Sequence, residues 1–171
     1  MINYEELKEI LLKSKNIAYI SVPILPKNNK YARLIYDNFA GNEGEFTVVS
    51  QYIYEHMILK KDINISRILL DIAMEEMYHL DILGQVILGV GEKPMLINSE
   101  GKEWNSKILN YEEYNLKELM EINIELEKRS ILGYQNLIRY TNNIVLKRIY
   151  ERIILDEKNH LLIFEKIRDE Y

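Results

Sequence analysis

Two Glu-x-x-His units constrain the fold of this chain more than any other feature of its sequence. They are Glu76 to His79 and Glu157 to His160, and they contain two of the chain's three histidines. A Glu and a His three residues apart on an α-helix lie on one face, where both side chains can reach the same metal ion. The units therefore predict a helical protein in which two ligand pairs meet around metal.

An internal repeat extends this pattern. Glu45 lies 31 positions before Glu76, and Glu127 lies 30 positions before Glu157. Each of these upstream glutamates is followed seven positions later by a tyrosine, Tyr52 or Tyr134. Two Glu-x-x-His units and one Glu from each of two further helices form the ligand set of a dinuclear centre inside a four-helix bundle. The repeat predicts that four carboxylates and two imidazoles meet midway along such a bundle.

Apolar periodicity supplies the helices for this bundle. We expect a short leading helix over residues 4–16 with Asn3 as its N-cap, ended by Pro23 and Pro26. Four longer stripes follow, at about 29–60, 69–90, 116–137 and 146–167. They are joined by a short link near 61–64, an aperiodic stretch at 92–114 that contains Trp104, and a turn at 142–143.

A short link, a long crossover and a short link give a four-helix bundle whose second and third helices run parallel. With 171 residues, the chain fits a single domain with a substantial core. We expect residues 1–26 to form the N-terminal helix and linker, and residues 27–171 to form the bundle. The predicted fold class is all-α.

The four glutamates matter because each replaces an apolar residue in a stripe that is otherwise core. An unpaired carboxylate there costs several kcal/mol or becomes neutral, and no Lys or Arg occupies the stripes at that level. Two divalent ions would balance the charge, whereas ordinary buried ion pairs are the metal-free alternative. Neighbouring acids are expected to face solvent or adjoining loops; these are Glu43, Glu75, Glu125 and Asp156.

Composition excludes several other classes of protein. The chain has no cysteine, which excludes disulfides, thiolate zinc sites and a built-in rubredoxin module. A formal net charge of −5 with no basic cluster argues against nucleic acid as a partner. Because no stretch approaches the roughly 20 apolar residues of a membrane span, we expect a soluble cytoplasmic protein.

Four segments together resemble a known family: GNEGEFTVVSQYIYEH, EEMYHL, ELEKRSILGY and DEKNHLLIFE. They are similar to the rubrerythrin and manganese-catalase branch of the ferritin-like superfamily, to which bacterioferritin is also related. The resemblance covers about residues 30–168. Each Glu-x-x-His alone would be weak, but the set is specific. The sequence departs from full rubrerythrins by lacking their rubredoxin tail, and it is shorter than typical manganese catalases.

The resemblance also implies roles for individual residues. Glu45 and Glu127 would be terminal ligands, Glu76 and Glu157 would bridge two metals, and one nitrogen ligand would come from each of His79 and His160. Either Tyr52 or Tyr134 would sit beside the centre as a hydrogen-bond donor, although both tyrosines are equally compatible with a purely structural core role. The metals would be two iron or two manganese ions, because carboxylate-rich sites suit these ions better than copper or zinc.

These expectations favour an oxidoreductase that removes hydrogen peroxide or dioxygen. A reductase would need an external small electron carrier, whereas a catalase would take its electrons from a second peroxide. A ferroxidase or iron-handling protein, or a structural assembly component stabilised by metal, remains as an alternative. We expect a homo-oligomer, a dimer or larger. Among other residues, we expect a packing or surface role for His56, and loop anchoring or a subunit contact for Trp104. At Gly41 and Gly44 we expect either close packing or space for a substrate.

Overall fold

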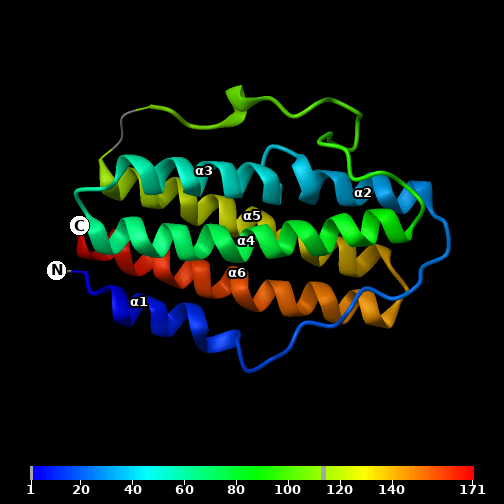
Figure 1. Ribbon diagram of the computed structural model, residues 1–171, viewed down its shortest axis with the longest axis horizontal. Coiled ribbons are helices and arrows are strands. Elements are labelled where there is room, and N and C mark those ends of the chain that lie inside the picture. The colour runs from blue at the N-terminus through cyan, green and yellow to red at the C-terminus, as the bar shows by residue number, and fades with distance from the viewer. Residues whose placement is uncertain (1, 113–114) are drawn as a thin grey trace.

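The computed structural model describes residues 2–112 and 115–171, and the regular secondary structure of these residues is almost entirely helical (Figure 1). Within them, only an isolated bridge between Ile97 and Glu103 has β character. The α-helices are α1 Tyr4–Leu11, α2 Asn29–Ala40, α3 Glu45–Ile58, α4 Ile63–Gly89, α5 Leu116–Tyr140 and α6 Ile144–Glu170. Short 3-10 turns occupy Leu12–Ser14 and Ser106–Ile108.

The long helices form the expected four-rod bundle. The first rod consists of α2 and α3, which lie end to end in Figure 1, and the other rods are α4, α5 and α6. The α3–α4 and α5–α6 pairs make the most extensive contacts, while α1 packs outside the bundle against α4 and α6. The predicted fold, with its long crossover between the second and third rods and its extra N-terminal helix, is confirmed.

Asparagine caps set several of the helix starts. Asn115 forms a capping box with Glu118, and the side chain of Asn143 accepts from the backbone N–H groups of Val145 and Leu146. Each cap satisfies donors that the first turn of a helix leaves unpaired. Asn3 caps α1 as the sequence predicted, but that helix ends at Leu11 and continues only as a 3-10 turn to Ser14.

The first rod is interrupted, and the expectation of one continuous helix over 29–60 is wrong in its middle. The helix stops after Ala40 and restarts at Glu45. A Cβ at Gly41 or Gly44 would lie 2.4 Å or 2.7 Å from the backbone oxygen of Asp37, so only glycine fits this backbone path. The two glycines therefore serve the chain's own turn rather than a neighbouring helix, and the turn makes Glu45 the first residue of α3.

Trp104 holds the crossover against the outside of α3. The indole nitrogen of Trp104 donates to Thr47 Oγ1 at 2.9 Å, and its ring meets the Phe46 ring edge-on at a centroid distance of 4.9 Å. Trp104 thus anchors the loop as predicted. Residues 113–114, the end of the expected crossover, lie outside the described residues. His56 has the expected packing role, because its Nδ1 lies 2.6 Å from the carbonyl oxygen of Ser66 on α4.

Two apolar clusters fill the bundle, one toward each end. The first joins α2 to the C-terminal halves of α4 and α5 and the N-terminal half of α6. The second joins α1 and α3 to the opposite halves of the same three helices. A buried polar layer lies between them, which places the candidate site midway along the rods. Over the residues that the structure describes, no helix has both the length and the apolar character that a bilayer span requires.

Candidate metal centre

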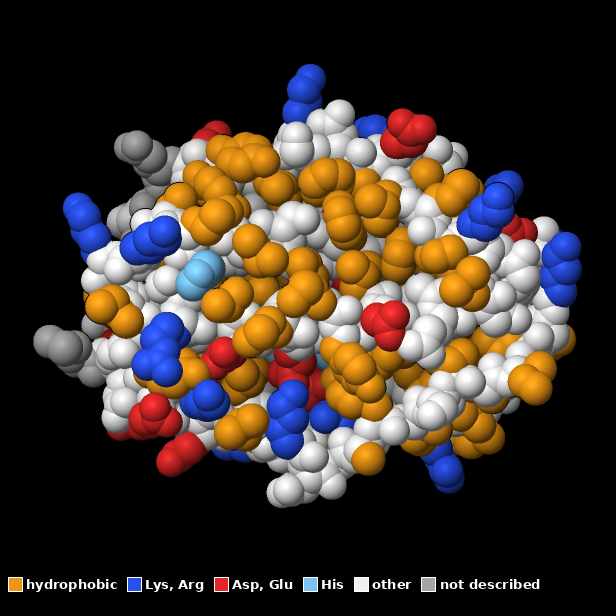
Figure 2. Space-filling view, in the orientation of Figure 1, with side chains coloured by type: hydrophobic (Ala, Val, Ile, Leu, Met, Phe, Trp, Pro, Cys, Tyr) orange, Lys and Arg blue, Asp and Glu red, His pale blue; other side chains and the backbone are white. Residues whose placement is uncertain are grey.

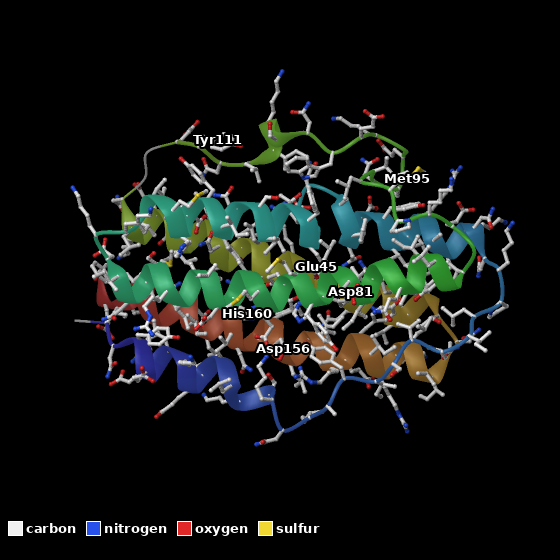
Figure 3. All side chains as sticks on the ribbon, in the orientation of Figure 1. Glu45, Asp81, Met95, Tyr111, Asp156 and His160 are labelled. Carbon is white, nitrogen blue, oxygen red and sulfur yellow. The ribbon has the colours of Figure 1, made fainter. Side chains whose placement is uncertain are left out.

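The bundle brings all six sequence-predicted ligand residues together in its middle. Each rod contributes: Glu45 from α3, Glu76 and His79 from α4, Glu127 from α5, and Glu157 and His160 from α6. Every one of these side chains is almost completely buried, with at most 2% of its surface exposed. Figure 3 shows Glu45 and His160 among the helices near the centre of the molecule.

The six residues divide into two overlapping groups of four. The first contains Glu45, Glu76, His79 and Glu157, and the second contains Glu76, Glu127, Glu157 and His160. Within each group, one ligand atom from every residue lies within 4.8 Å of the others. Glu76 and Glu157 belong to both groups. Two cations could therefore sit side by side, each with one carboxylate and one imidazole of its own and with two shared carboxylates.

Both imidazoles turn the same nitrogen toward this cluster. Nδ1 of His79 lies 2.7 Å from Glu76 Oε2 and 3.3 Å from Glu157 Oε1. Nδ1 of His160 lies 2.9 Å from Glu76 Oε1, although without the angles of a hydrogen bond. Nδ1 is therefore the atom that each histidine offers to a metal, while Nε2 points away from the centre.

Several buried oxygen atoms of the cluster have no partner, and this tests whether the residues fit metal. One carboxylate oxygen has no hydrogen bond in each of Glu45, Glu76, Glu127 and Glu157. Nδ1 of His160 also has no hydrogen bond. A buried polar atom without a partner costs about 1–3 kcal/mol. Divalent cations would satisfy these atoms together, because oxygen and imidazole donors are the ligands that iron and manganese accept. The donor set fits a dinuclear centre.

The pKa shifts of the buried residues also fit a metal site. Burial, and then the charges of Glu76 and Glu157, hold the pKa of Glu45 and of Glu127 well above the ordinary value. Burial alone would lower the pKa of His79 and His160, but the carboxylate of Glu76 and the hydrogen-bonding acids outweigh it and raise both. Without metal, these raised pKa values favour the protonated forms of the two glutamates and the two histidines, and a bound metal would displace those protons.

The two repeat tyrosines contact the carboxylates crosswise. Tyr52 on α3 donates to Glu127 on α5, and Tyr134 on α5 donates to Glu45 on α3. Both tyrosines are fully buried. Burial and the adjacent carboxylates raise the pKa of both phenols well above the ordinary value, so the hydroxyls remain donors. Each tyrosine therefore orients the glutamate of the opposite half of the repeat.

Two acids that the sequence analysis turned toward solvent or adjoining loops do contact the adjoining N-terminal segment, but they also contact the imidazoles of the site, which was not expected. Glu75 Oε2 lies 3.0 Å from Nε2 of His160, and Asp156 Oδ2 lies 3.2 Å from Nε2 of His79. Both acids are buried, and Figure 3 shows Asp156 on α6 close to His160. The other two acids behave as expected, since the half-exposed side chains of Glu43 and Glu125 pair with Arg129 at the surface.

A further layer behind these acids was missed by the sequence analysis. Lys15 pairs with Glu75, while Ser14 and Tyr19 donate to Asp156. Arg152 Nη1 lies 2.6 Å from Asp156 Oδ2. Burial would raise the pKa of Asp156, but hydrogen bonds from His79 and Arg152 lower it well below the ordinary value. One signal was available, because an acid directly precedes the Glu of each unit, in Glu75-Glu76 and Asp156-Glu157.

Comparison with known proteins gives matches that agree with this geometry. The family model described as manganese containing catalase matches residues 12–93. A probable manganese catalase of Clostridium acetobutylicum is 26% identical over 168 residues, which cover 86% of this chain and 74% of the relative.

Solved structures share the fold over most of the chain. The manganese catalase KatB of Anabaena superposes with a TM-score of 0.81 at 25% identity, covering 90% of this chain and 78% of that protein. A bacterioferritin of Rhodobacter capsulatus, solved with a metal-free dinuclear site, gives a TM-score of 0.70 at 23% identity and covers 86% and 88% of the two chains. At that identity the bacterioferritin supports the fold alone.

Proposed function

We propose that this chain, a member of the ferritin-like superfamily of dinuclear metal proteins by its likeness to manganese catalases, is an oxidoreductase that breaks down hydrogen peroxide with two manganese ions. One observation carries the proposal: two groups of four buried ligand residues share Glu76 and Glu157 in the middle of the bundle. The likeness to manganese catalases supports both the metal and the substrate. Iron and dioxygen are the alternatives that the test must exclude.

In this proposal Glu76 and Glu157 would help to hold both ions, because they alone belong to both groups. Glu45 and His79 would hold one ion with them, and Glu127 and His160 would hold the other. The bound pair supplies the redox chemistry, since two adjacent ions can exchange two electrons with one peroxide molecule. The donor set is oxygen-rich with only two nitrogens, which suits manganese or iron better than copper or zinc.

The protein's own residues hold this arrangement and keep bulk water away from it. Tyr52 and Tyr134 fix the carboxylates of Glu127 and Glu45. On the outer side, Asp156 and Glu75 accept from the Nε2–H groups of His79 and His160, which fixes the tautomer that leaves Nδ1 free to bind metal. With the ligands at most 2% exposed, these interactions act in a medium where they are stronger than in water.

Electron supply divides the proposal into two forms. As a catalase, the protein would convert two hydrogen peroxide molecules to two waters and one dioxygen, and no partner would be required. As a peroxide reductase, it would convert one hydrogen peroxide to two waters with two electrons and two protons from an external small carrier. The similarity to manganese catalases supports the first form; both require the same ligand set.

Metal analysis followed by peroxide turnover tests the proposal. Protein purified from its natural host is expected to contain two manganese ions per chain, and to consume hydrogen peroxide alone or with a reductant. Glu76→Ala should abolish turnover, because it removes a shared ligand. Glu125→Gln is the matched control, since Glu125 is an exposed acid paired with Arg129, and it should behave like the wild type.

Three results would contradict the proposal. Iron in place of manganese, with Fe(II) oxidised and retained, would indicate an iron-handling protein. Iron with dioxygen consumed in place of peroxide would indicate an oxidase. A melting temperature that falls on chelation while peroxide is never consumed would indicate that metal has only a structural role. Fractionation and size-exclusion chromatography would test the cytoplasmic location and the homo-oligomer that we also propose.

A further inference from the structure

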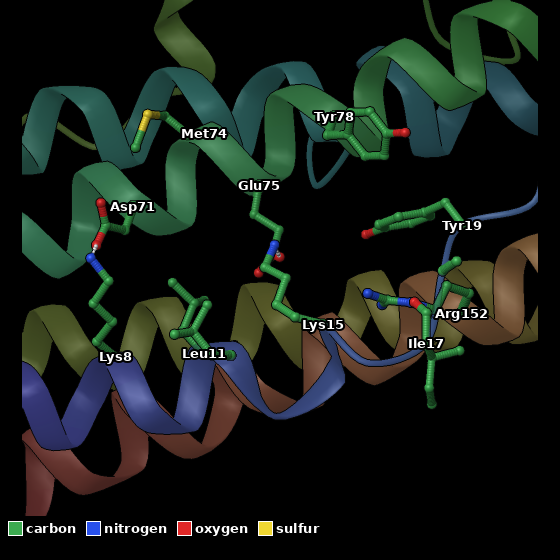
Figure 4. A pocket seen from close by; sticks show the side chains of 12 residues that line it. Lys8, Leu11, Lys15, Ile17, Tyr19, Asp71, Met74, Glu75, Tyr78 and Arg152 are labelled. Atoms are coloured by element: carbon green, nitrogen blue, oxygen red, sulfur yellow. Dashed lines mark hydrogen bonds and ion pairs between the residues drawn. The ribbon is translucent and has the colours of Figure 1, made fainter.

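A cavity of about 540 Å³ opens beside the metal centre, between α4 and the N-terminal segment of residues 8–19. Figure 4 shows α4 along one side of it and α1 along the other, with the Lys15–Glu75 pair spanning the space between them. In Figure 2 this face is hollowed below α4, where acidic and basic side chains lie among apolar ones. The volume falls in the range of sites for small molecules and cofactors, which is about 300–1,000 Å³.

The cavity has aromatic walls at one end, and Met74 lies toward the other end beside Asp71 (Figure 4). The rings of Tyr19 and Tyr78 meet edge to face at a centroid distance of 4.8 Å, and Met74 and Leu12 also line the cavity. Tyr78, Met74 and Leu12 are 50%, 49% and 44% exposed. Large apolar side chains gathered around a concave surface indicate a binding site more often than chance exposure. Because the Arg152 guanidinium lies over the Tyr19 ring, the half-exposed Tyr78 ring and the Met74 thioether are the surfaces that a flat aromatic ring can contact.

The floor of the cavity consists of the outer partners of both imidazoles. Tyr19 Oη lies 2.9 Å from Nε2 of His79. Glu75, which also lines the cavity, lies 3.0 Å from Nε2 of His160. An occupant is therefore separated from each proposed metal ligand by a single residue.

The geometry also limits what an occupant can do. Both histidines present Nδ1 to the centre and Nε2 to the cavity side, so the imidazoles and their acids stand between the cavity and the metals. A molecule in the cavity could not coordinate metal, and peroxide bound there could not react. It could still exchange electrons with the centre through the hydrogen-bonded Tyr19 and His79.

We propose that this cavity binds a flat aromatic two-electron reductant, of the quinol or reduced-flavin class, which passes its electrons to the centre through Tyr19 and His79. The inference rests on the proposed function in its peroxide-reductase form, and the ground for that choice is the cavity, since the likeness to manganese catalases supports the other form. The overall reaction is balanced: the reductant loses two electrons and two protons to become the quinone or oxidised flavin, the O–O bond breaks, and hydrogen peroxide becomes two waters.

The charged groups of the cavity suit this class of molecule. Lys15 is 47% exposed in its side chain, and its ammonium group lies in the cavity, where it pairs with Glu75. A lysine at that position stabilises the oxygen or nitrogen anion that a reduced ring carries. Lys8 and Asp71 lie 3.9 Å apart at the other end, and with Arg152 the lining of the cavity carries three basic and two acidic side chains.

Binding can be measured on the manganese-loaded protein with two probes, menadione for the quinones and flavin mononucleotide for the flavins. We expect saturable binding of one of them, which would identify the class. Met74→Arg should weaken that binding at least about tenfold, because it places a charged side chain at the cavity wall. Met77→Arg is the matched control, since Met77 is 42% exposed on the same helix but does not line the cavity.

Electron transfer provides the second readout. Oxidation of the reduced probe by hydrogen peroxide should slow at least about tenfold in Met74→Arg and stay unchanged in Met77→Arg, while any oxygen evolved from peroxide alone stays the same in both. No saturable binding of either probe, or equal weakening in both variants, would overturn the inference and leave the proposed function untouched. Binding without any peroxide consumption would overturn the electron-donor role and the proposed function together.

Discussion

Nε2 of His160 on α6 lies 3.0 Å from Oε2 of Glu75 on α4, and the relationship is reciprocal, because Nε2 of His79 on α4 lies 3.2 Å from Oδ2 of Asp156 on α6. Each acid directly precedes the Glu of its own Glu-x-x-His unit and contacts the histidine of the other. The two units are therefore interlocked. A unit positions its own two ligands and also orients the histidine of its counterpart.

The interlock predicts a loss of metal affinity when either acid is neutralised. Glu75→Gln and Asp156→Asn keep the shape of the side chain but weaken the hydrogen bond that it accepts from the imidazole Nε2–H. Partners of this kind are worth about 10–100-fold in metal affinity. We expect a loss of that size for each variant, measured by competition with a chelator. Glu125→Gln should bind manganese as the wild type does, and unchanged affinity in all three variants would refute the interlock.

The buried cluster of six candidate ligands could be predicted from the sequence because helical periodicity alone decides which side of a rod faces the core. Glu45, Glu76, Glu127 and Glu157 fall on apolar stripes, and a repeat of 30 or 31 positions aligns the two halves. The histidines follow from the three-residue spacing. Nothing about tertiary contacts was required, so the bundle, its crossover and the six residues were all within reach of pattern arguments.

The outer acids could not be placed in the same way, because their surroundings are built from a distant part of the chain. Glu75 lies about 100° around the helix from Glu76, on a side that would face solvent in an isolated four-helix bundle. Here the N-terminal segment covers that side and supplies Lys15 and Tyr19. The break in the first rod was also hidden, since it depends on a backbone path at Gly41 that leaves no room for a Cβ beside the backbone of Asp37.

The space around each glycine predicts opposite effects for alanine substitutions at Gly41 and Gly84. Gly41→Ala would place a Cβ 2.4 Å from the Asp37 oxygen, so the turn before Glu45 must distort and the protein should lose stability. Gly84→Ala lies inside α4, where the new Cβ would meet its nearest neighbour at an ordinary 3.6 Å. Alanine should stabilise the helix there by about 1 kcal/mol. Thermal unfolding of both variants would reveal the difference, and equal melting temperatures would disprove it.

Removing a single hydroxyl tests the tyrosine contacts. Tyr134→Phe leaves the buried carboxyl of Glu45 without its donor, which should cost about 1–3 kcal/mol in the unfolding free energy of the metal-free protein. Tyr52→Phe should do the same through Glu127. Tyr140→Phe is the control, because Tyr140 is 68% exposed. Urea denaturation measures all three, and a Tyr134→Phe protein as stable as the control would show that the contact contributes nothing.

Glu55 is a buried acid outside the metal centre. In the described part of the chain, its hydrogen-bond partners include no cation. Glu55 on α3 is fully buried and accepts from the side-chain amides of Gln51 at 2.9 Å and Asn123 at 2.6 Å. Burial raises its pKa from 4.5 to about 7, although the two amides oppose the shift. Glu55 therefore keeps its proton in the folded state over a range where the unfolded chain has released it.

Glu55 should make the protein less stable as the pH rises. Below pH 4.5 both states are protonated and the acid has no effect. Between about 4.5 and 7 the unfolded state binds fewer protons than the folded state, so the unfolding free energy falls with pH. The shift of about 2.5 units corresponds to about 3 kcal/mol at 1.36 kcal/mol per unit. Glu55→Gln cannot ionise, so relative to the wild type it should gain about that much stability between pH 5 and pH 8 in urea denaturation. A difference between the two proteins that does not change with pH would mean that Glu55 ionises as freely in the bundle as in water.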